Sequence, residues 1–173
     1  MHYGYKLIFP TLFIILMIFG LSCGYKFAGS GNLPEGVQKV SVAIFKNNTA
    51  ETGLENTFTN DLIYEFIRGG RTVFPDRENA DAVISGTVRS IGVASAVRTD
   101  SSSSTERRVT ITVDVKLTAR DGRVIWSAKD VSEDQTYIVE EDKQATDENK
   151  NDAIEYVSKR LAEYVIRRMT DDF

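Results

Sequence analysis

The chain has 173 residues, with 21 Lys and Arg against 25 Asp and Glu, one histidine and one cysteine. His2 and Cys23 both lie near the N-terminus, so a chain that is cut before Cys23 keeps 151 residues (173 minus 22), no histidine and a formal net charge of −5 (20 minus 25). Such a chain has no means to build a Ser-His-Asp or Cys-His catalytic site, a histidine metal site or an internal disulfide, and its negative charge disfavours nucleic-acid binding. We therefore expect a single domain that is not an enzyme and carries no metal or other cofactor.

Residues 1–22 have the layout of a secretory signal peptide. A cationic start with Lys6 precedes an apolar run from Leu7 to Leu21 and a small residue, Ser22. The alternative, a transmembrane helix, is disfavoured because the run is shorter than the roughly 20 residues needed to cross a bilayer and is interrupted by Pro10. We expect residues 1–22 to be removed on export.

The position of Cys23, directly after this apolar run, resembles a bacterial lipoprotein cleavage site. Gly20 departs from that pattern, because such sites usually carry Leu three residues before the cysteine. We expect Cys23 to be acylated, which would anchor the protein stably through several acyl chains. Residues 23–36 are rich in glycine and are expected to form the lipidated N-terminus and a tether. The next residue is Gly24 rather than Asp, which is similar to lipoproteins sent to the outer membrane.

The domain proper, residues 37–173, opens with a strand and a helix. Residues 37–45 alternate apolar and small or polar side chains with a period of two, which predicts a strand. Thr52 and Glu55 have the spacing of a capping box at the start of a helix. Apolar residues at three-to-four spacing then continue the helix as far as Gly69-Gly70, and we assign this stripe to the core.

A second strand is expected from about Asp81 to Val97, and its side-chain alternation reverses around Arg89-Ser90, which predicts a β-bulge. A polar loop, residues 99–106, is expected to connect it to an antiparallel third strand. That third strand, residues 109–119, has the clearest alternation in the chain.

Asp121-Gly122 predicts a two-residue type I′ hairpin, in which both central residues need positive φ, between the third strand and a fourth. The fourth strand begins with Val124-Ile125-Trp126, and the apolar patch at residues 137–139 could extend it. Residues 130–151 are acidic, and we interpret them as a solvated segment rather than a general acid/base pair. The final helix, about residues 149–169, has one apolar stripe and a polar face of both charges, which favours packing on the sheet over lying on a membrane.

The predicted order is therefore β-α-β-β-β-α. It indicates an α+β fold, a two-layer α/β sandwich with both helices on one face of a four-stranded mixed sheet. The first two strands are expected to be parallel, because a helix connects them. The other sheet face is expected to stay polar and available to a partner.

Three arginines form the one local cation cluster that the sequence suggests as a binding site. Arg98 precedes the serine-rich loop, and Arg107 and Arg108 follow it. Arginine binds phosphate through two parallel hydrogen bonds, so the three are candidate ligand-binding residues. The alternative is that exposed arginines at a hairpin tip only keep a strand edge soluble.

The sequence resembles the LPS-assembly lipoprotein family (LptE-type). The resemblance rests on Cys23-Gly24-Tyr25-Lys26-Phe27, Leu33-Pro34, Phe45-Lys46-Asn47-Asn48-Thr49, Gly53-Leu54-Glu55 and Ala80-Asp81-Ala82-Val83-Ile84-Ser85-Gly86. It implies a lipid-anchored protein on the periplasmic side of the outer membrane, with two partners: a large outer-membrane β-barrel, in which it acts as plug and assembly subunit, and lipopolysaccharide. No family ligand residue aligns with Arg98, Arg107 or Arg108.

A second interpretation is an outer-membrane lipoprotein that activates a peptidoglycan synthase or another envelope complex. A lipoprotein that is anchored in the outer membrane and acts across the periplasm needs a long disordered linker. Only about 13 residues separate Cys23 from the first predicted strand, which disfavours this interpretation. A secreted enzyme is a third interpretation, disfavoured by the missing catalytic residues.

Overall fold

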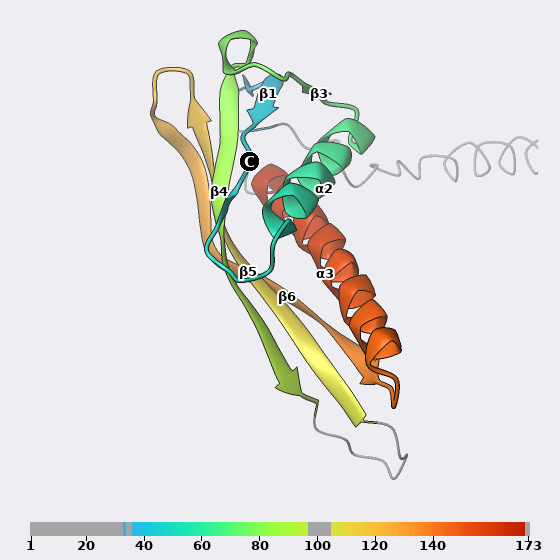
Figure 1. Cartoon of the computed structure of the whole chain (residues 1–173). Coiled ribbons are helices and arrows are strands. Elements are labelled where there is room, and N and C mark those ends of the chain that lie inside the picture. Colours follow the sequence, from blue (N-terminus) through green and yellow to red (C-terminus); the bar gives the residue numbers. More distant parts are fainter. Residues whose placement is uncertain (1–32, 34–35, 97–104, 172–173) are drawn as a thin grey trace, which may run out of the picture. The chain divides into compact units, whose positions relative to one another are not determined.

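The structure is a computed structural model that describes residues 33, 36–96 and 105–171. The predictions for the signal peptide, Cys23 and Arg98 lie outside the described residues. The elements follow one another as β1 (Lys39–Val42), β2 (Lys46–Asn47), α2 (Leu54–Arg68), β3 (Thr72–Val73), the 3-10 helix η2 (Arg77–Asn79), β4 (Ala82–Ser95), β5 (Thr105–Ala119), β6 (Val124–Val139) and α3 (Lys143–Asp171) (Figure 1).

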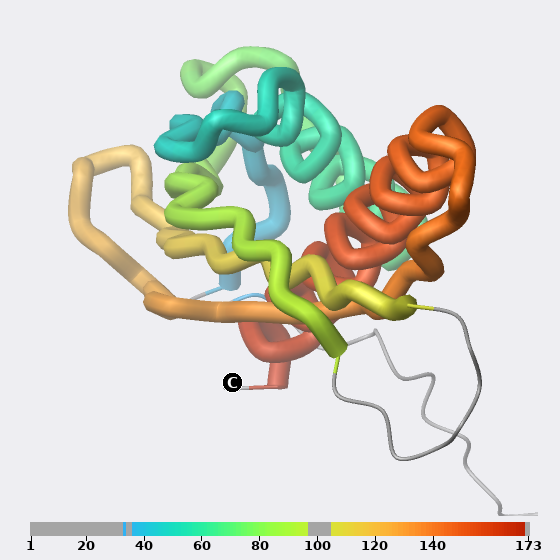
Figure 2. The backbone as a smooth tube through the Cα atoms, turned by 60° about the horizontal axis from the view of Figure 1, so that its bottom comes forward, coloured from blue at the N-terminus to red at the C-terminus, as the bar shows by residue number. Residues whose placement is uncertain are grey.

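The sheet is mixed, with strand order β3-β1-β4-β5-β6 and β2 paired to β4. β1 and β2 run parallel to β4, as expected for strands joined through a helix, while β4, β5 and β6 are antiparallel neighbours. Both helices lie on one side of the sheet, next to one another (Figure 2). The α+β prediction is thus confirmed, but the expected number of four strands is wrong. The structure has six, because β2 and β3, of two residues each, are too short to show a period in the sequence.

The core lies between the helices and the sheet. It contains most of the predicted stripe of α2, the odd-numbered residues of β5 from Val109 to Leu117 and the predicted stripe of α3. The assignment of the whole α2 stripe to the core is wrong at its end, because Ile67 is 58% exposed. The largest side chains that are fully buried include Phe58, Leu62, Phe66, Ile84, Leu161 and Met169. Burial of each such side chain contributes about 1.5–3 kcal/mol, so this contact holds the two layers together. Within residues 36–96 and 105–171, no helix is long and apolar enough to cross a membrane.

The start of α2 differs from the expected capping box. The N-cap is Gly53, with φ at 90°, and no side chain bonds to the helix start. Glu55 accepts a hydrogen bond from Asn47 Nδ2 at 2.7 Å, and the same amide group donates to the Glu51 carbonyl oxygen at 2.8 Å. The backbone N–H of Glu55 itself and the Asn47 amide lower the pKa of the Glu55 carboxyl. Asn47 therefore orders the connection from β2 into α2, a task that sequence spacing had assigned to Thr52.

The carboxylate of Asp81, the residue directly before β4, connects the start of β4 to β1. Asp81 accepts hydrogen bonds from the backbone N–H groups of Lys39 at 2.9 Å and Gln38 at 3.2 Å, and these bonds lower the pKa of its carboxyl. The Asp81 N–H in turn donates to the Lys39 carbonyl oxygen at 2.8 Å. These contacts fix the parallel register of β1 on β4.

Gly86, in the middle of β4, has no room for a side chain. A methyl group at this position would overlap the carbonyl oxygen of Asp114 and the ring of Phe45. Phe45 lies across the glycine and meets Phe58 of α2 edge to face, with ring centroids 5.0 Å apart. Gly86 therefore lets the segment after β1 pack closely on the sheet.

Two bulges lie at the same level of the sheet. The pairing of β4 with β5 shifts between Val88 and Ser90, as the sequence predicted, and β6 has a second irregularity at Asp130, with φ at 51°. Asp114 of β5 joins them, because it accepts a bond from the Asp130 N–H at 2.9 Å and one from Arg89 Nη1 at 3.0 Å. The Asp130 N–H, followed by Arg89, lowers the pKa of the Asp114 carboxyl.

The β5–β6 hairpin forms at the predicted place but with another turn. Only Gly122 has a positive φ, at 93°, and its N–H donates to the Ala119 carbonyl oxygen at 2.9 Å. The Ala119 N–H donates to the Arg123 carbonyl oxygen at 2.8 Å. This is a three-residue loop with glycine in the left-handed position, so the predicted type I′ turn is wrong.

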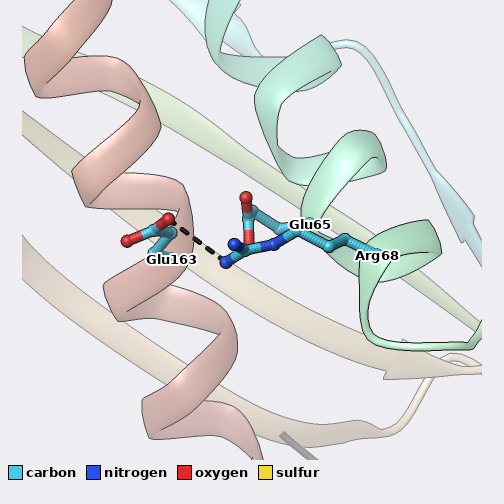
Figure 3. Close-up of polar contacts among 3 residues, drawn as sticks. All are labelled: Glu65, Arg68 and Glu163. Atoms are coloured by element: carbon cyan, nitrogen blue, oxygen red, sulfur yellow. Dashed lines mark hydrogen bonds and ion pairs between the residues drawn. The ribbon is translucent and has the colours of Figure 1, made fainter.

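Polar contacts connect the two helices. Arg68 at the end of α2 contacts Glu65 at 2.6 Å and reaches Glu163 of α3 at 3.2 Å (Figure 3). Closer to the start of both helices, the Ser158 hydroxyl donates to Asp61 at 2.5 Å. Asp61 is half-buried, and its burial raises the pKa of its carboxyl despite this hydrogen bond.

Candidate functional site

The candidate site is the distal end of the sheet, defined as Ser90–Ser95 of β4, Thr105–Ile111 of β5 and Val131–Val139 of β6. β1 and β2 pair with β4 only as far as Val88, so among the described strands the rest of β4 pairs with β5 alone. α3 packs chiefly on β6 and also on β5, and residues 92–95 of β4 are exposed. α3 covers β6 at the distal end, whereas the end of β4 is left uncovered, in the lower part of Figure 1.

The two described arginines of the predicted cluster lie on opposite faces of this end. Arg107 alternates in phase with Val109, whose side chain is buried under the helices, whereas Arg108 is in phase with Thr110 on the polar face. Arg108 forms an ion pair with Asp134 of β6 at 3.3 Å. The two side chains therefore do not converge on one phosphate, and Arg98 lies outside the described residues.

Arg107 has different surroundings. Its side chain is exposed and forms no ion pair with any residue that the structure describes. It stands opposite Ser95 of β4 and Tyr137 of β6, and the next residue along β4 on the same face is Val93, which is 46% exposed. A guanidinium beside an exposed apolar strip is suited to a ligand with an anionic group next to a hydrocarbon part.

A groove lies between the end of β6 and the first half of α3. Its volume is about 420 Å³, and it is lined by Gln135, Thr136, Tyr137, Ile138, Glu140, Asn149, Asp152, Ala153 and Tyr156. Tyr137 is buried, while Ile138 and Tyr156 are 44% and 48% exposed. Sequence reasoning missed this groove, because it treated residues 130–151 as a solvated segment. The available signal was the apolar Tyr137-Ile138 pair within that acidic run.

Side chains close the outer edge of β6 beside the groove. Asn149 of α3 donates to the Ile138 carbonyl oxygen at 3.1 Å, and Gln135 donates to that of Thr136 at 3.2 Å. The Thr146 hydroxyl donates to the Glu140 carbonyl oxygen at 3.2 Å and accepts from the Glu140 N–H at 2.9 Å. These bonds occupy backbone groups that an added strand would need.

Carboxylates surround the groove, and some of them are not neutralised. Glu133 pairs with Arg160 at 3.3 Å, but Glu140 and Asp152, both exposed on the lining, form no ion pair within the described part of the chain. The described residues contain no group of three or more His, Cys, Asp or Glu arranged to hold a metal ion. On its helix side, the distal end thus carries Arg107 on β5 and, next to it, an acidic groove along β6.

A comparison with models of protein families assigns the chain to a family. The family model described as lipopolysaccharide assembly, LptE, matches residues 37–169, which is most of the chain. The chain belongs to the LptE family. LptE proteins are outer-membrane lipoproteins of lipopolysaccharide assembly, and as a family they work with an outer-membrane β-barrel. No curated protein matches the chain in sequence.

Solved structures share the fold of this LptE chain. A minor lipoprotein from Acinetobacter baumannii is 16% identical, with a TM-score of 0.52 over 78% of this chain and 92% of that one. The uncharacterized lipoprotein B of Nitrosomonas europaea is 12% identical, with a TM-score of 0.53 over 83% and 87%. The rare lipoprotein B of Shewanella oneidensis is 7% identical, with a TM-score of 0.52 over 78% and 95%. At these identities the likeness concerns the fold alone.

The described residues on which the LptE resemblance rests have structural roles in the fold. Phe45 and Gly86 pack against each other, Asn47 orders the entry to α2, Gly53 begins that helix and Asp81 ties β1 to β4. All five lie away from the distal end. Family membership therefore accounts for the architecture, and the ligand-binding surface has to be found from the structure itself.

Proposed function

We propose that this protein is the lipoprotein subunit of a lipopolysaccharide translocon. In this proposal residues 1–22 are removed, Cys23 carries the acyl chains that hold the protein on the periplasmic side of the outer membrane, and residues 23–36 are the tether. The domain of residues 37–173 is the plug and assembly partner of a large β-barrel and supports insertion of lipopolysaccharide into the outer leaflet. Membership of the LptE family supports the general role, and the signal-like leader with its cysteine supports the anchor.

The surface chemistry of the sheet fits such a position. The face away from the helices carries Thr110, Thr112, Asp114 and Lys116 along β5, all of them polar. The lumen of a wide outer-membrane barrel is polar, so a plug has to present hydrophilic surface to it. The distal end can extend beyond the plug body, because the helices do not cover β4 there.

The placement of Arg107 is the observation that carries the ligand proposal. Lipopolysaccharide has phosphate groups next to acyl chains, and Arg107 stands next to the exposed Val93 on one face. Arginine makes two-point hydrogen bonds to phosphate, and Val93 with Ile91 offers an apolar surface to a chain. Arg108, by contrast, is held by Asp134 on the other face.

The neighbouring arginines provide a matched test. The purified full-length protein in detergent is titrated with lipopolysaccharide, and Arg107→Ala is compared with Arg108→Ala. Because a charge-assisted hydrogen bond contributes about 1.5–3 kcal/mol, we expect Arg107→Ala to weaken binding about tenfold or more, with a smaller change for Arg108→Ala. Equal effects, or no effect of either substitution, would contradict the assignment of Arg107.

The translocon role is tested separately. The tagged protein is purified from detergent-solubilised outer membrane, and the proteins that accompany it are identified. We expect a stoichiometric large β-barrel. A peptidoglycan synthase in its place would support the other envelope role and refute this one.

A further inference from the structure

We infer that the groove between β6 and α3 is a docking site for a protein segment in which a basic side chain lies next to an aliphatic one. Arg107 lies on the same face of the sheet, on β5 opposite Tyr137 of the groove lining, but it is not itself a lining residue. The test below therefore measures segment binding and lipopolysaccharide binding separately, so that failure of one proposal is distinguished from failure of the other.

The shape of the groove limits the size of its occupant. A volume of about 420 Å³ lies near the lower end of the roughly 300–1,000 Å³ that small-ligand sites occupy. The space suits one or two side chains and is too small for a glycolipid with several acyl chains. Ala153 and the buried Tyr137 contribute apolar surface to the lining, and the exposed Ile138 and Tyr156 add more, so one part of the occupant is apolar.

The charge around the groove determines the other part of the occupant. Residues 130–155 contain ten Asp and Glu against two Lys. Both lysines are engaged, Lys143 with Asp147 and Lys150 with Glu51 at 2.8 Å, which leaves Glu140 and Asp152 on the lining without a cation among the described residues. On the lining itself, these two carboxylates attract a lysine or arginine side chain and disfavour a phosphate, while Arg107 lies outside the lining on β5.

The capped edge of β6 determines how the segment binds. Gln135, Asn149 and Thr146 occupy the outward carbonyl groups at residues 136, 138 and 140, so a partner cannot extend the sheet here. The occupant has to insert side chains between β6 and α3. Asn149 also connects the two walls, since it lies on α3 and bonds to β6, so the groove is preformed.

The test uses the full-length protein in detergent and two labelled synthetic peptides, one with alternating leucine and arginine and one in which glutamate replaces each arginine. Fluorescence anisotropy measures their binding at low and at high salt. The variant Glu140→Lys with Asp152→Lys reverses both charges on the lining. Asp76→Lys with Glu78→Lys makes the same change in charge at exposed positions next to and within η2, away from the groove, and serves as the matched control.

We expect the native protein and the control variant to bind the arginine peptide and not the glutamate peptide, with weaker binding at high salt. The double variant should bind the arginine peptide at least about tenfold more weakly, because two charge pairs are lost. Ile138→Ser should weaken it as well, while lipopolysaccharide binding remains unchanged in all these variants. The inference is overturned if the arginine peptide does not bind, if the control variant loses binding as much as the double variant, or if Ca²⁺ alone occupies the site and excludes the peptide.

Discussion

At the scale of single residues, the close approach of two neighbours explains why a glycine stands at the centre of β4. Gly86 has a neighbour on each side, the backbone of β5 and the ring of Phe45, and neither can move without disturbing the pairing of β4 with β5 or the contact with Phe58. Gly92 in the same strand has nothing within 4 Å of the position where a side chain would begin. Within one strand, therefore, Gly86 has no room for a side chain and Gly92 has ample room for one.

Gly86→Ala is expected to destabilise the protein by about 3 kcal/mol or more, because overpacking of a tight contact costs about 1–3 kcal/mol and one of the clashing groups is backbone. Gly92→Ala is the control, with a change near zero or slightly stabilising, since alanine restricts the unfolded chain. Urea unfolding of both variants measures the difference. Similar free energies of unfolding for the two would show that Phe45 does not lie across Gly86.

At the scale of elements, the contact of α2 with α3 contains one carboxylate that opposes the folded state at neutral pH. Asp61 is half-buried, and its raised pKa means that the folded protein holds a proton more tightly than the unfolded chain does. The contribution of Asp61 to stability is thus complete below its ordinary pKa of 3.8 and is lost as the pH rises through the raised value. The exposed ion pair between Arg68 and Glu163 contributes little, about 0–1 kcal/mol.

Asp61→Asn should therefore raise the melting temperature at pH 7 relative to the native protein, and the gain should shrink as the pH is lowered to about 4. The asparagine oxygen can still accept the hydrogen bond from Ser158, so packing is retained. Glu163→Gln, at an exposed position of the same contact, should change the melting temperature little at any pH. A loss of stability in Asp61→Asn that is the same at every pH would mean that the charge of Asp61 is not penalised.

The long elements were predictable because their periods are strong. The buried stripes of α2 and α3, the alternation of β5 and the bulge after Val88 all follow from the order of apolar residues. β2 and β3 were not predictable, since two residues carry no period and their pairing depends on distant strands. The turn at Gly122 was placed correctly but given the wrong type, because a positive φ at the glycine alone suffices in a longer loop.

The candidate site was less predictable than the fold. Sequence placed the third strand from residue 109, so it did not show that Arg107 and Arg108 continue the strand and point to opposite faces. Asp134 as the partner of Arg108 depends on the register of β5 with β6, which the bulge at Asp130 shifts. The groove depends on α3 starting at Lys143, earlier than its apolar stripe indicates.

At the scale of the whole molecule, the proposed attachment through Cys23 decides where the protein acts. The chain contains one cysteine, so any thioether-linked lipid has a single possible position. Several acyl chains together give stable anchoring, whereas one gives only reversible binding. The proposed function requires this anchor, because the domain has to stay at the membrane where its barrel partner lies.

Cys23→Ser should abolish labelling with radioactive palmitate and move the protein from the membrane fraction to the soluble fraction of the periplasm. Gly20→Leu introduces the residue that lipoprotein cleavage sites usually carry three positions before the cysteine. This variant is the control, and its labelling should be equal to that of the native protein or higher. Persistent labelling of Cys23→Ser, or membrane retention with an uncleaved leader, would refute lipidation at Cys23.

The two outer edges of the distal end are unequal, and this gives the sheet a single direction of lateral growth. At the end of β6, side chains from α3 and from the strand itself donate hydrogen bonds to the carbonyl groups of residues 136, 138 and 140. On β4, residues 92–95 are exposed, and β5 is the one strand partner of residues 90–95 within the described chain. At the distal end, the backbone groups left for a further strand are therefore those of β4. That leaves the groove beside β6 free, so the protein can hold two neighbours at once without competition between them.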